Sequence, residues 1–229
     1  MAAASAASFP GATEHWFDYC GASVYQADVD LLRPGQWLND IVITFAVDYV
    51  SHELAPDRTS WRFCHPPVSA IARFEDDPED LRHSLFSLRL ESRDVALFPV
   101  NDNPFGHVAG GTHWSLLVFR RRDPEGPRFL HFDSRAGSNA AVAKDLAGRL
   151  AKIVCPDRFS PVSVVEAACP QQNNSSDCGV FTVLVAEALG TGATDEAIAA
   201  IPGTAGAAHR RTLLARCEEM RRKTAAAKD

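Results

Sequence analysis

The stretch PQQNNSSDCGVFTVLVAEAL, residues 170–189, decides how this chain folds and what it can do. Its first half is polar, prone to turns, and leads directly to Cys178. Its second half, from Val180 to Leu189, is almost wholly apolar and predicts a buried helix. The thiol then lies at a helix N-terminus, where the partial positive charge favours thiolate over thiol. The sequence therefore indicates Cys178 as a candidate nucleophile.

Composition restricts the class of protein. The chain has 229 residues, 46% of them apolar, which suits one sizeable domain with a real core. A net charge of −6 provides no overall basic field for nucleic acid. No apolar run approaches the roughly 18 residues that span a bilayer, and the N-terminus lacks the features of a signal peptide. We expect an intracellular protein, cytoplasmic and/or nuclear, without nucleic-acid or membrane partners.

The chain is expected to form a single domain at residues 15–224, between a disordered Ala/Ser-rich leader at 1–14 and a flexible tail at 225–229. Six scattered cysteines show neither a C-x-x-C pair nor zinc-like Cys/His spacing. Without a secretion signal we expect reduced thiols, and apart from Cys178 we expect them to be small core residues. We expect no metal and no organic cofactor.

Hydrophobic periodicity and turn signals predict most of the secondary structure. Helices are predicted at residues 39–53, 78–85, 139–153, 178–190 and 209–223, and strands at residues 95–100, 114–120, 128–133 and 161–165. The rest of residues 56–82 is predicted to form loops, and the Asn/Gly-rich loop at 101–112 has little to hold it rigid. Strands and helices do not alternate regularly, which predicts an α+β fold.

The strands at residues 114–120 and 128–133 are predicted to form a hairpin whose turn centres near Pro124. This pairing places His113 opposite Arg135, with Asp133 one diagonal step away and within side-chain reach. A thiol nucleophile usually needs a histidine base that a carboxylate or amide orients. His113 and Asp133 are therefore the predicted base and orienting acid.

Acyl transfer also requires hydrogen-bond donors for the developing oxyanion. The backbone N–H of Cys178, at the start of the predicted helix, is one candidate. The side-chain amide of Gln171 or of Gln172, just upstream, is another.

Four segments of the chain, in this order, resemble the cysteine proteases that process ubiquitin-like modifiers, the sentrin/SUMO-specific proteases and their deneddylase relatives. They are WLND at 37–40, GTHWSLLV at 111–118, HFDS at 131–134, and the segment at 170–179. The resemblance covers roughly residues 22–190. It implies a papain-like fold of the adenain/sentrin-protease type, in which a catalytic helix packs on a small mixed sheet.

The resemblance also implies roles for individual residues. Cys178 would be the nucleophile, His113 the base and Asp133 the residue that orients it. The oxyanion glutamine stands six residues before the cysteine in the SUMO-protease form of the motif, which is Gln172 here. The deneddylase form is one residue shorter in this segment, which leaves Gln171 as a second candidate.

The substrates of the resembled family end in Gly-Gly, and the resemblance implies a channel that admits only this thin tail. Trp37 and Trp114 would form its walls and roof, because flat aromatic faces against glycine leave no room for a Cβ. Asp40 would lie near the channel entrance and face the body of the modifier.

The resemblance extends to two branches of the family. Residues 100–117 and the compact size resemble the deneddylases, whereas the Gln172-to-Cys178 spacing resembles the SUMO proteases. The longer match favours a thiol protease that cleaves after the Gly-Gly of a NEDD/Rub-type modifier, in deconjugation and precursor processing. We expect it to be a monomer. The alternative is a SUMO-specific protease. An acyltransferase of the same catalytic plan and a non-catalytic module that binds ubiquitin-like proteins are less favoured.

Overall fold

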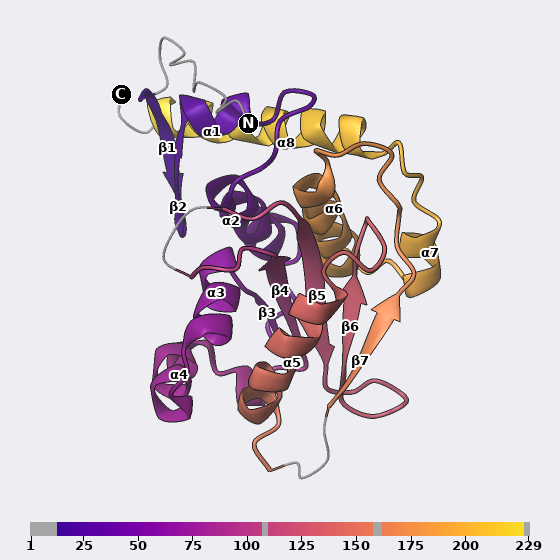
Figure 1. The fold of residues 1–229 in the computed structure, drawn as a ribbon. Coiled ribbons are helices and arrows are strands. Elements are labelled where there is room, and N and C mark those ends of the chain that lie inside the picture. The colour runs from indigo at the N-terminus through magenta and orange to yellow at the C-terminus, as the bar shows by residue number, and fades with distance from the viewer. Residues whose placement is uncertain (1–12, 107–109, 158–161, 227–229) are drawn as a thin grey trace.

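The computed structural model describes residues 13–106, 110–157 and 162–226 (Figure 1). Most of the predicted leader, residues 107–109 of the glycine-rich loop, and residues 227–229 of the predicted tail lie outside the described residues. No helix in the described part of the chain is long and apolar enough to cross a membrane.

A five-stranded mixed sheet forms the centre of the molecule. Its spatial order is β3 (Trp61–Phe63), β4 (Val95–Asn101), β5 (Trp114–Arg120), β6 (Arg128–Phe132) and β7 (Ser163–Ala167). The three central strands are antiparallel, and each outer strand pairs parallel with its neighbour. Leu116 pairs with Phe132, which confirms the hairpin register predicted around Pro124.

Helices cover both faces of the sheet (Figure 1). One face carries α2 (Asp40–Tyr49), α6 (Cys178–Gly190) and α8 (Gly206–Ala226), and the other carries α3 (Pro66–Phe74), α4 (Pro78–Leu85) and α5 (Ala140–Val154). Alternation along β5 explains the two layers, because Leu116 and Val118 pack with the first group while Leu117 and Phe119 pack with the second. The predicted α+β class, with the helix that begins at Cys178 packed on a mixed sheet, is confirmed.

Smaller elements complete the fold. The N-terminal part forms the two-stranded sheet β1 (His15–Tyr19) and β2 (Ala22–Tyr25), followed by α1 (Gln26–Asp30). A π-helical turn at Val50–Leu54 continues α2, 3-10 turns lie at Phe86–Leu88 and Leu90–Ser92, and α7 (Asp195–Ala199) precedes α8.

The prediction of loops in residues 56–82 is wrong for two segments, β3 and α3. Strand β3 has only three residues, too few for a periodic signal. Helix α3 begins with Pro66 and Pro67, and proline is compatible with the first turn of a helix although it breaks a helix interior. Helix α8 begins at Gly206 rather than His209 and runs to Ala226, so the first two residues of the predicted tail are helical.

All six cysteines are free thiols, as expected. Cys64 and Cys217 are buried, and Cys155 and Cys169 are half-buried. The expectation of a core residue is wrong for Cys20, which is exposed between β1 and β2 with a φ of 47°. A tight turn between two short strands places this residue outside the core.

Truncating a core side chain of the sheet tests this packing. Phe119 on β5 is fully buried, and its ring lies 5.2 Å from that of Phe129, centroid to centroid. We expect Phe119→Ala to lower the free energy of unfolding by about 3–5 kcal/mol, measured by urea denaturation. Phe86, which is 74% exposed, provides the matched control, and Phe86→Ala should change stability by less than about 0.5 kcal/mol. Similar losses in both variants would contradict the assignment.

Candidate active site

Three elements bring the predicted catalytic side chains together. Cys178 is the first residue of α6, His113 directly precedes β5, and Asp133 directly follows β6. Because β5 and β6 are antiparallel, the start of one lies beside the end of the other. Helix α6 packs against β5, which brings the thiol to the same edge of the sheet. All three side chains are buried.

The His113 ring and the Asp133 carboxylate form a short buried hydrogen bond. Nε2 of His113 donates to Oδ1 of Asp133 at 2.6 Å. The carboxylate also accepts from the backbone N–H of Arg135 at 3.0 Å and from that of Asn139 at 2.9 Å. Burial alone would raise the pKa of Asp133, but these hydrogen bonds and the charge of His113 lower it. Asp133 is therefore a carboxylate at neutral pH.

The second ring nitrogen of His113 is left for the thiol. Nδ1 is buried and is not used by Asp133, and the Cys178 thiol is a neighbouring acidic group whose hydrogen bond and charge act on the ring together with those of Asp133. Burial alone would lower the pKa of His113, but hydrogen bonding and charge from Asp133 and Cys178 raise it to about 9. The imidazole therefore holds its proton at neutral pH.

The Cys178 thiol shows the complementary shift. Burial alone would raise its pKa, but the hydrogen bond and charge of His113 and the backbone N–H groups of Trp114 and Gly179 lower it. Opposite shifts of two neighbouring groups favour a thiolate–imidazolium pair. Such a pair is a nucleophile already activated in the free protein.

Asn139 connects the start of β5 to the segment that follows β6, because it binds both His113 and Asp133. Its side chain is fully buried, and Nδ2 donates to the carbonyl of His113 at 3.3 Å and to Oγ of Ser115 at 3.0 Å. Its backbone N–H binds Asp133, as described above. Ser115 in turn contacts the buried ring of His131 at 2.9 Å, and His131 binds Glu166 at 2.8 Å. A polar network that is buried as far as His131 and ends on the exposed carboxylate of Glu166 therefore supports His113 and Asp133.

Asp102 fixes the segment just before β5. Its carboxylate accepts a hydrogen bond from the backbone N–H of His113 at 3.0 Å and another from the hydroxyl of Thr112 at 2.6 Å. Arg73 donates to the carbonyls of Asn101 and Asn103 at 2.7 and 3.1 Å. The expectation that little holds this loop is wrong for its described ends, because charged side chains replace the missing regular structure.

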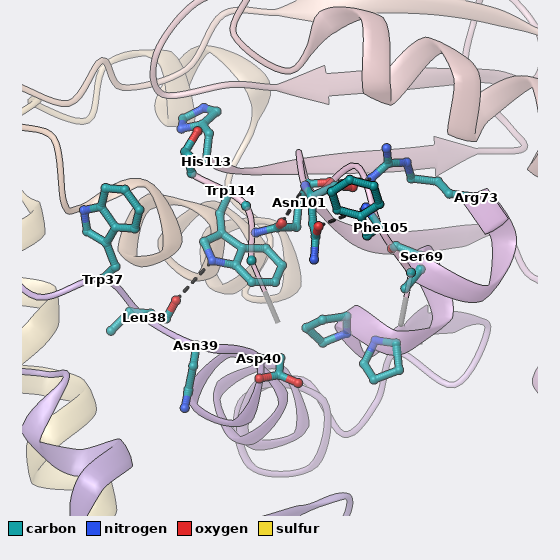
Figure 2. Close-up of a pocket in the computed structure, with 18 of the residues that line it drawn as sticks. Trp37, Leu38, Asn39, Asp40, Ser69, Arg73, Asn101, Phe105, His113 and Trp114 are labelled. Atoms are coloured by element: carbon teal, nitrogen blue, oxygen red, sulfur yellow. Dashed lines mark hydrogen bonds between the residues drawn. The ribbon is translucent and has the colours of Figure 1, made fainter. Parts of the chain in front are cut away.

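The predicted channel residues lie around one cavity of about 600 Å³ (Figure 2). Trp37 is 47% exposed, and Asp40 is exposed at the start of α2. Trp114 is half-buried, and its Nε1 donates to the carbonyl of Leu38 at 3.1 Å. His113 and Cys178 line the same cavity. The structure therefore places both tryptophans next to the reactive pair.

Helix α3 supplies the other side of this cavity. Figure 2 shows Ser69, Arg73 and Phe105 across the cavity from Trp37. The sequence predicts a loop in place of α3 and therefore does not predict this wall. It predicts Asn139 only as the start of a helix, although polar residues at helix starts often hydrogen-bond to nearby backbone groups.

The two candidate oxyanion glutamines differ in their contacts. Gln171 donates from Nε2 to the carbonyl of Asp133 at 3.0 Å and accepts from the backbone N–H of Ala136 at 3.0 Å, so both ends of its amide brace the loop after β6. Gln172 accepts from the Ser134 hydroxyl at 2.8 Å and donates to the carbonyl of Asn174 at 2.6 Å. Neither is among the residues that line the cavity.

The described residues include no group of three or more His, Cys, Asp or Glu side chains that could hold a metal ion. The chemistry available at this edge of the sheet is that of a thiolate, an imidazolium and a carboxylate. Together with a backbone N–H at a helix start, these groups suit covalent acyl transfer.

Comparisons with known proteins agree with this geometry. The family model of the Ulp1 protease family, C-terminal catalytic domain, matches residues 36–223. The chain is 34% identical over 172 residues to sentrin-specific protease 8 of Homo sapiens, covering 75% of this chain and 79% of that protein. It is 33% identical over 165 residues to NEDD8-specific protease 1 of Arabidopsis thaliana, covering 72% and 70%.

Solved structures show the same fold at lower identity. The C-terminal Ulp1 protease domain in complex with Smt3, the yeast ortholog of SUMO, superposes with a TM-score of 0.72 and 17% identity, covering 93% of this chain and 90% of that one. The Xanthomonas campestris effector XopD bound to ubiquitin superposes with a TM-score of 0.60 and 21% identity, covering 80% and 92%.

The charge of Asp133 is expected to set the reactivity of Cys178. In the wild type the lowered thiol pKa should keep alkylation by iodoacetamide fast at pH values below the ordinary thiol pKa of 9.0. Asp133→Asn keeps the shape but removes the charge that raises the His113 pKa, so the imidazolium stabilises the thiolate less. We expect the pH at which the alkylation rate begins to fall on acidification, the acid limb, to move to a higher value. Catalytic turnover should fall on the order of 10³-fold or more.

Alkylation rates measured across a pH series check this prediction. Cys178→Ala identifies the reacting thiol, because the fast phase should vanish in that variant. An acid limb at the same pH in the wild type and in Asp133→Asn would contradict it.

Proposed function

The chain belongs to the Ulp1 protease family, and we propose that it is a cysteine peptidase that cleaves after the C-terminal Gly-Gly of a NEDD8-type ubiquitin-like modifier. It would release the modifier from lysine side chains of conjugates and process its precursor. The observation that carries this proposal is the buried Cys178–His113–Asp133 cluster, whose thiol and imidazole line the same cavity as Trp37 and Trp114.

The reaction follows from the charges of the cluster. The Cys178 thiolate attacks the carbonyl carbon of the last glycine, forming a C–S bond and an oxyanion. As the C–N bond breaks, His113 gives its proton to the leaving amine. A water molecule then attacks the thioester while His113 accepts its proton, which releases the modifier carboxylate and restores the thiolate. Asp133 orients the ring and stabilises its charge throughout.

Two donors are proposed for the oxyanion. The backbone N–H of Cys178 is the first, since it stands at the start of α6 and has no helical partner there. The amide of Gln172 is the second. Its Nε2 donates to one carbonyl, that of Asn174 in its own loop, whereas Nε2 of Gln171 donates to the carbonyls of both Asp133 and Cys169. Gln172 therefore has the freer donor.

Close packing against the start of α6 fixes Leu38 and Trp114 beside the cavity. A Cβ added at Gly179 would lie 3.0 Å from Cβ of Leu38 and 3.4 Å from Cδ1 of Trp114. Leu38 and the Trp114 indole thus press against the start of α6, held by the indole hydrogen bond to the Leu38 carbonyl. This packing holds both side chains in place beside the cavity, and a tail without side chains is what we propose the channel between its walls admits.

The choice of modifier rests on the relatives. Those that are 33–34% identical are named sentrin-specific protease 8 and NEDD8-specific protease 1, whereas the Ulp1 domain bound to the SUMO ortholog is 17% identical. The Gln172-to-Cys178 spacing still favours the SUMO branch, so a SUMO-specific protease is the second candidate. We also propose that the protein acts as a monomer in the cytoplasm and/or nucleus, and that nucleic acid is not a partner.

Capture by electrophilic probes tests the function. Ubiquitin, SUMO and NEDD8 carrying an electrophile at the C-terminus are each mixed with the protein, and adducts are measured by intact-protein mass spectrometry. We expect a Cys178 adduct with the NEDD8 probe and slow or absent reaction with the others. Cys178→Ala should form no adduct and lose at least about 10³-fold in cleavage of a NEDD8 fusion.

The other outcomes of this experiment point elsewhere. Capture of the SUMO probe alone would replace the proposed modifier with SUMO. Binding of a modifier without any adduct, by a protein whose Cys178 still reacts with iodoacetamide, would indicate a non-catalytic binding module.

Removing the indole of Trp114 widens the proposed channel and tests its role. Trp114→Ala should lower kcat/KM for a NEDD8 fusion by about 10- to 100-fold and reduce discrimination against a Gly-Ala tail, since a methyl group is typically worth this much in a close-fitting site. Trp16→Ala, at a half-buried tryptophan stacked with Arg221 on α8, is the matched control. An unchanged Gly-Gly to Gly-Ala ratio in Trp114→Ala would argue against the channel.

A further inference from the structure

One buried arginine on the C-terminal helix uses all of its donors at once. The Arg210 side chain on α8 is 3% exposed. Its guanidinium carries five N–H donors, and the structure gives it five acceptors. They are Oδ1 of Asp177 at 2.7 Å and the carbonyls of Leu31 at 2.8 Å, Arg33 at 3.2 Å, Gln36 at 2.5 Å and Ser176 at 3.0 Å.

These acceptors lie on two segments that lead into the active site. Ser176 and Asp177 directly precede Cys178, and Gln36 directly precedes Trp37. The two segments are 140 or more residues apart in sequence, and Arg210 is bound to both. One side chain therefore fixes the approach of the chain to the nucleophile and to one wall of the channel.

Two further contacts hold the Asp177 carboxylate in place for Arg210. One comes from Asn174 in the loop before Cys178, and the other comes from Gly206 at the start of α8. Oδ2 of Asp177 accepts from Nδ2 of Asn174 at 2.9 Å, while Oδ1 of Asn174 accepts from the backbone N–H of Asp177 at 2.9 Å. A Cβ at Gly206, the first residue of α8, would lie 2.4 Å from Oδ2 of Asp177. The start of α8 thus presses directly on the carboxylate that precedes Cys178.

We propose that Arg210 is a positioning residue for the reaction: it holds the Cys178 backbone N–H and Trp37 in register, so that the carbonyl that reaches the thiolate also reaches the oxyanion donor. This inference rests on the proposed function. Lysine cannot replace arginine here, because an ammonium has three donors and no planar fork.

Arg210 acts through geometry and not through its charge. The guanidinium pairs with Asp177, and the groups that lower the Cys178 pKa are His113 and the backbone N–H groups of Trp114 and Gly179. Removing the fork should therefore impair acyl transfer, which needs the oxyanion donor, while leaving alkylation, which needs only the thiolate. A general loss of structure would impair both.

The test compares Arg210→Lys with Arg211→Lys, its exposed neighbour on the same helix. Circular dichroism and thermal unfolding first establish that both variants are folded. We then expect Arg210→Lys to lower kcat for a NEDD8 aminocoumarin substrate by about 10²-fold, the usual effect of an ångström-scale misplacement. Its iodoacetamide alkylation rate and acid limb should match the wild type. Arg211→Lys should match the wild type in every measurement.

A second variant covers the case in which Arg210→Lys does not fold. Gly206→Ala keeps Arg210 but pushes the Asp177 carboxylate, and it should also lower kcat without slowing alkylation. The proposal is overturned if the folded variants keep the wild-type kcat, or if alkylation falls in parallel with kcat. A wild type that alkylates normally but cleaves no NEDD8 substrate would instead overturn the proposed function, which separates the two failures.

Discussion

The buried hydrogen bond between His113 and Asp133 is the interaction on which the rest of the active site depends. A carboxylate is costly to bury unless it is fully hydrogen-bonded. Here the imidazole and two backbone N–H groups satisfy it. The charge retained on Asp133 keeps the proton on His113, and the protonated ring in turn stabilises the Cys178 thiolate. The nucleophile is thus prepared by a residue that it does not touch.

The fold brings these residues together at one end of the central strands. The antiparallel pairing of β5 and β6 sets His113 beside Asp133, and α6 packed on β5 brings Cys178 to the same edge. Helices pack against both faces of the sheet and so support the strands that carry this edge from two sides. The segment that carries Trp37 comes from the N-terminal part of the chain, and Arg210 on α8 binds it through the carbonyl of Gln36. The C-terminal helix therefore helps to support the active site.

Local patterns predicted the parts of the site that depend on local structure. The hairpin register follows from one turn and two apolar strands, so His113 and Asp133 could be paired from the sequence, and the apolar run after Cys178 located α6. Long-range contacts could not be predicted in this way. Arg210 lies in the helix predicted at residues 209–223, and nothing in that local pattern indicates that it meets acceptors 33 and 174 residues away. The prolines that begin α3 looked like loop residues and hid one wall of the cavity.

We expect His113 to carry a proton at neutral pH because Asp133 and the Cys178 thiolate lie on either side of its ring. Nitrogen chemical shifts of the His113 ring, assigned by comparison with His113→Gln and followed across pH, report its protonation. Both ring nitrogens should be protonated at neutral pH, with the transition at about 9. A neutral ring at pH 7, with a transition near the ordinary value of 6.5, would contradict it.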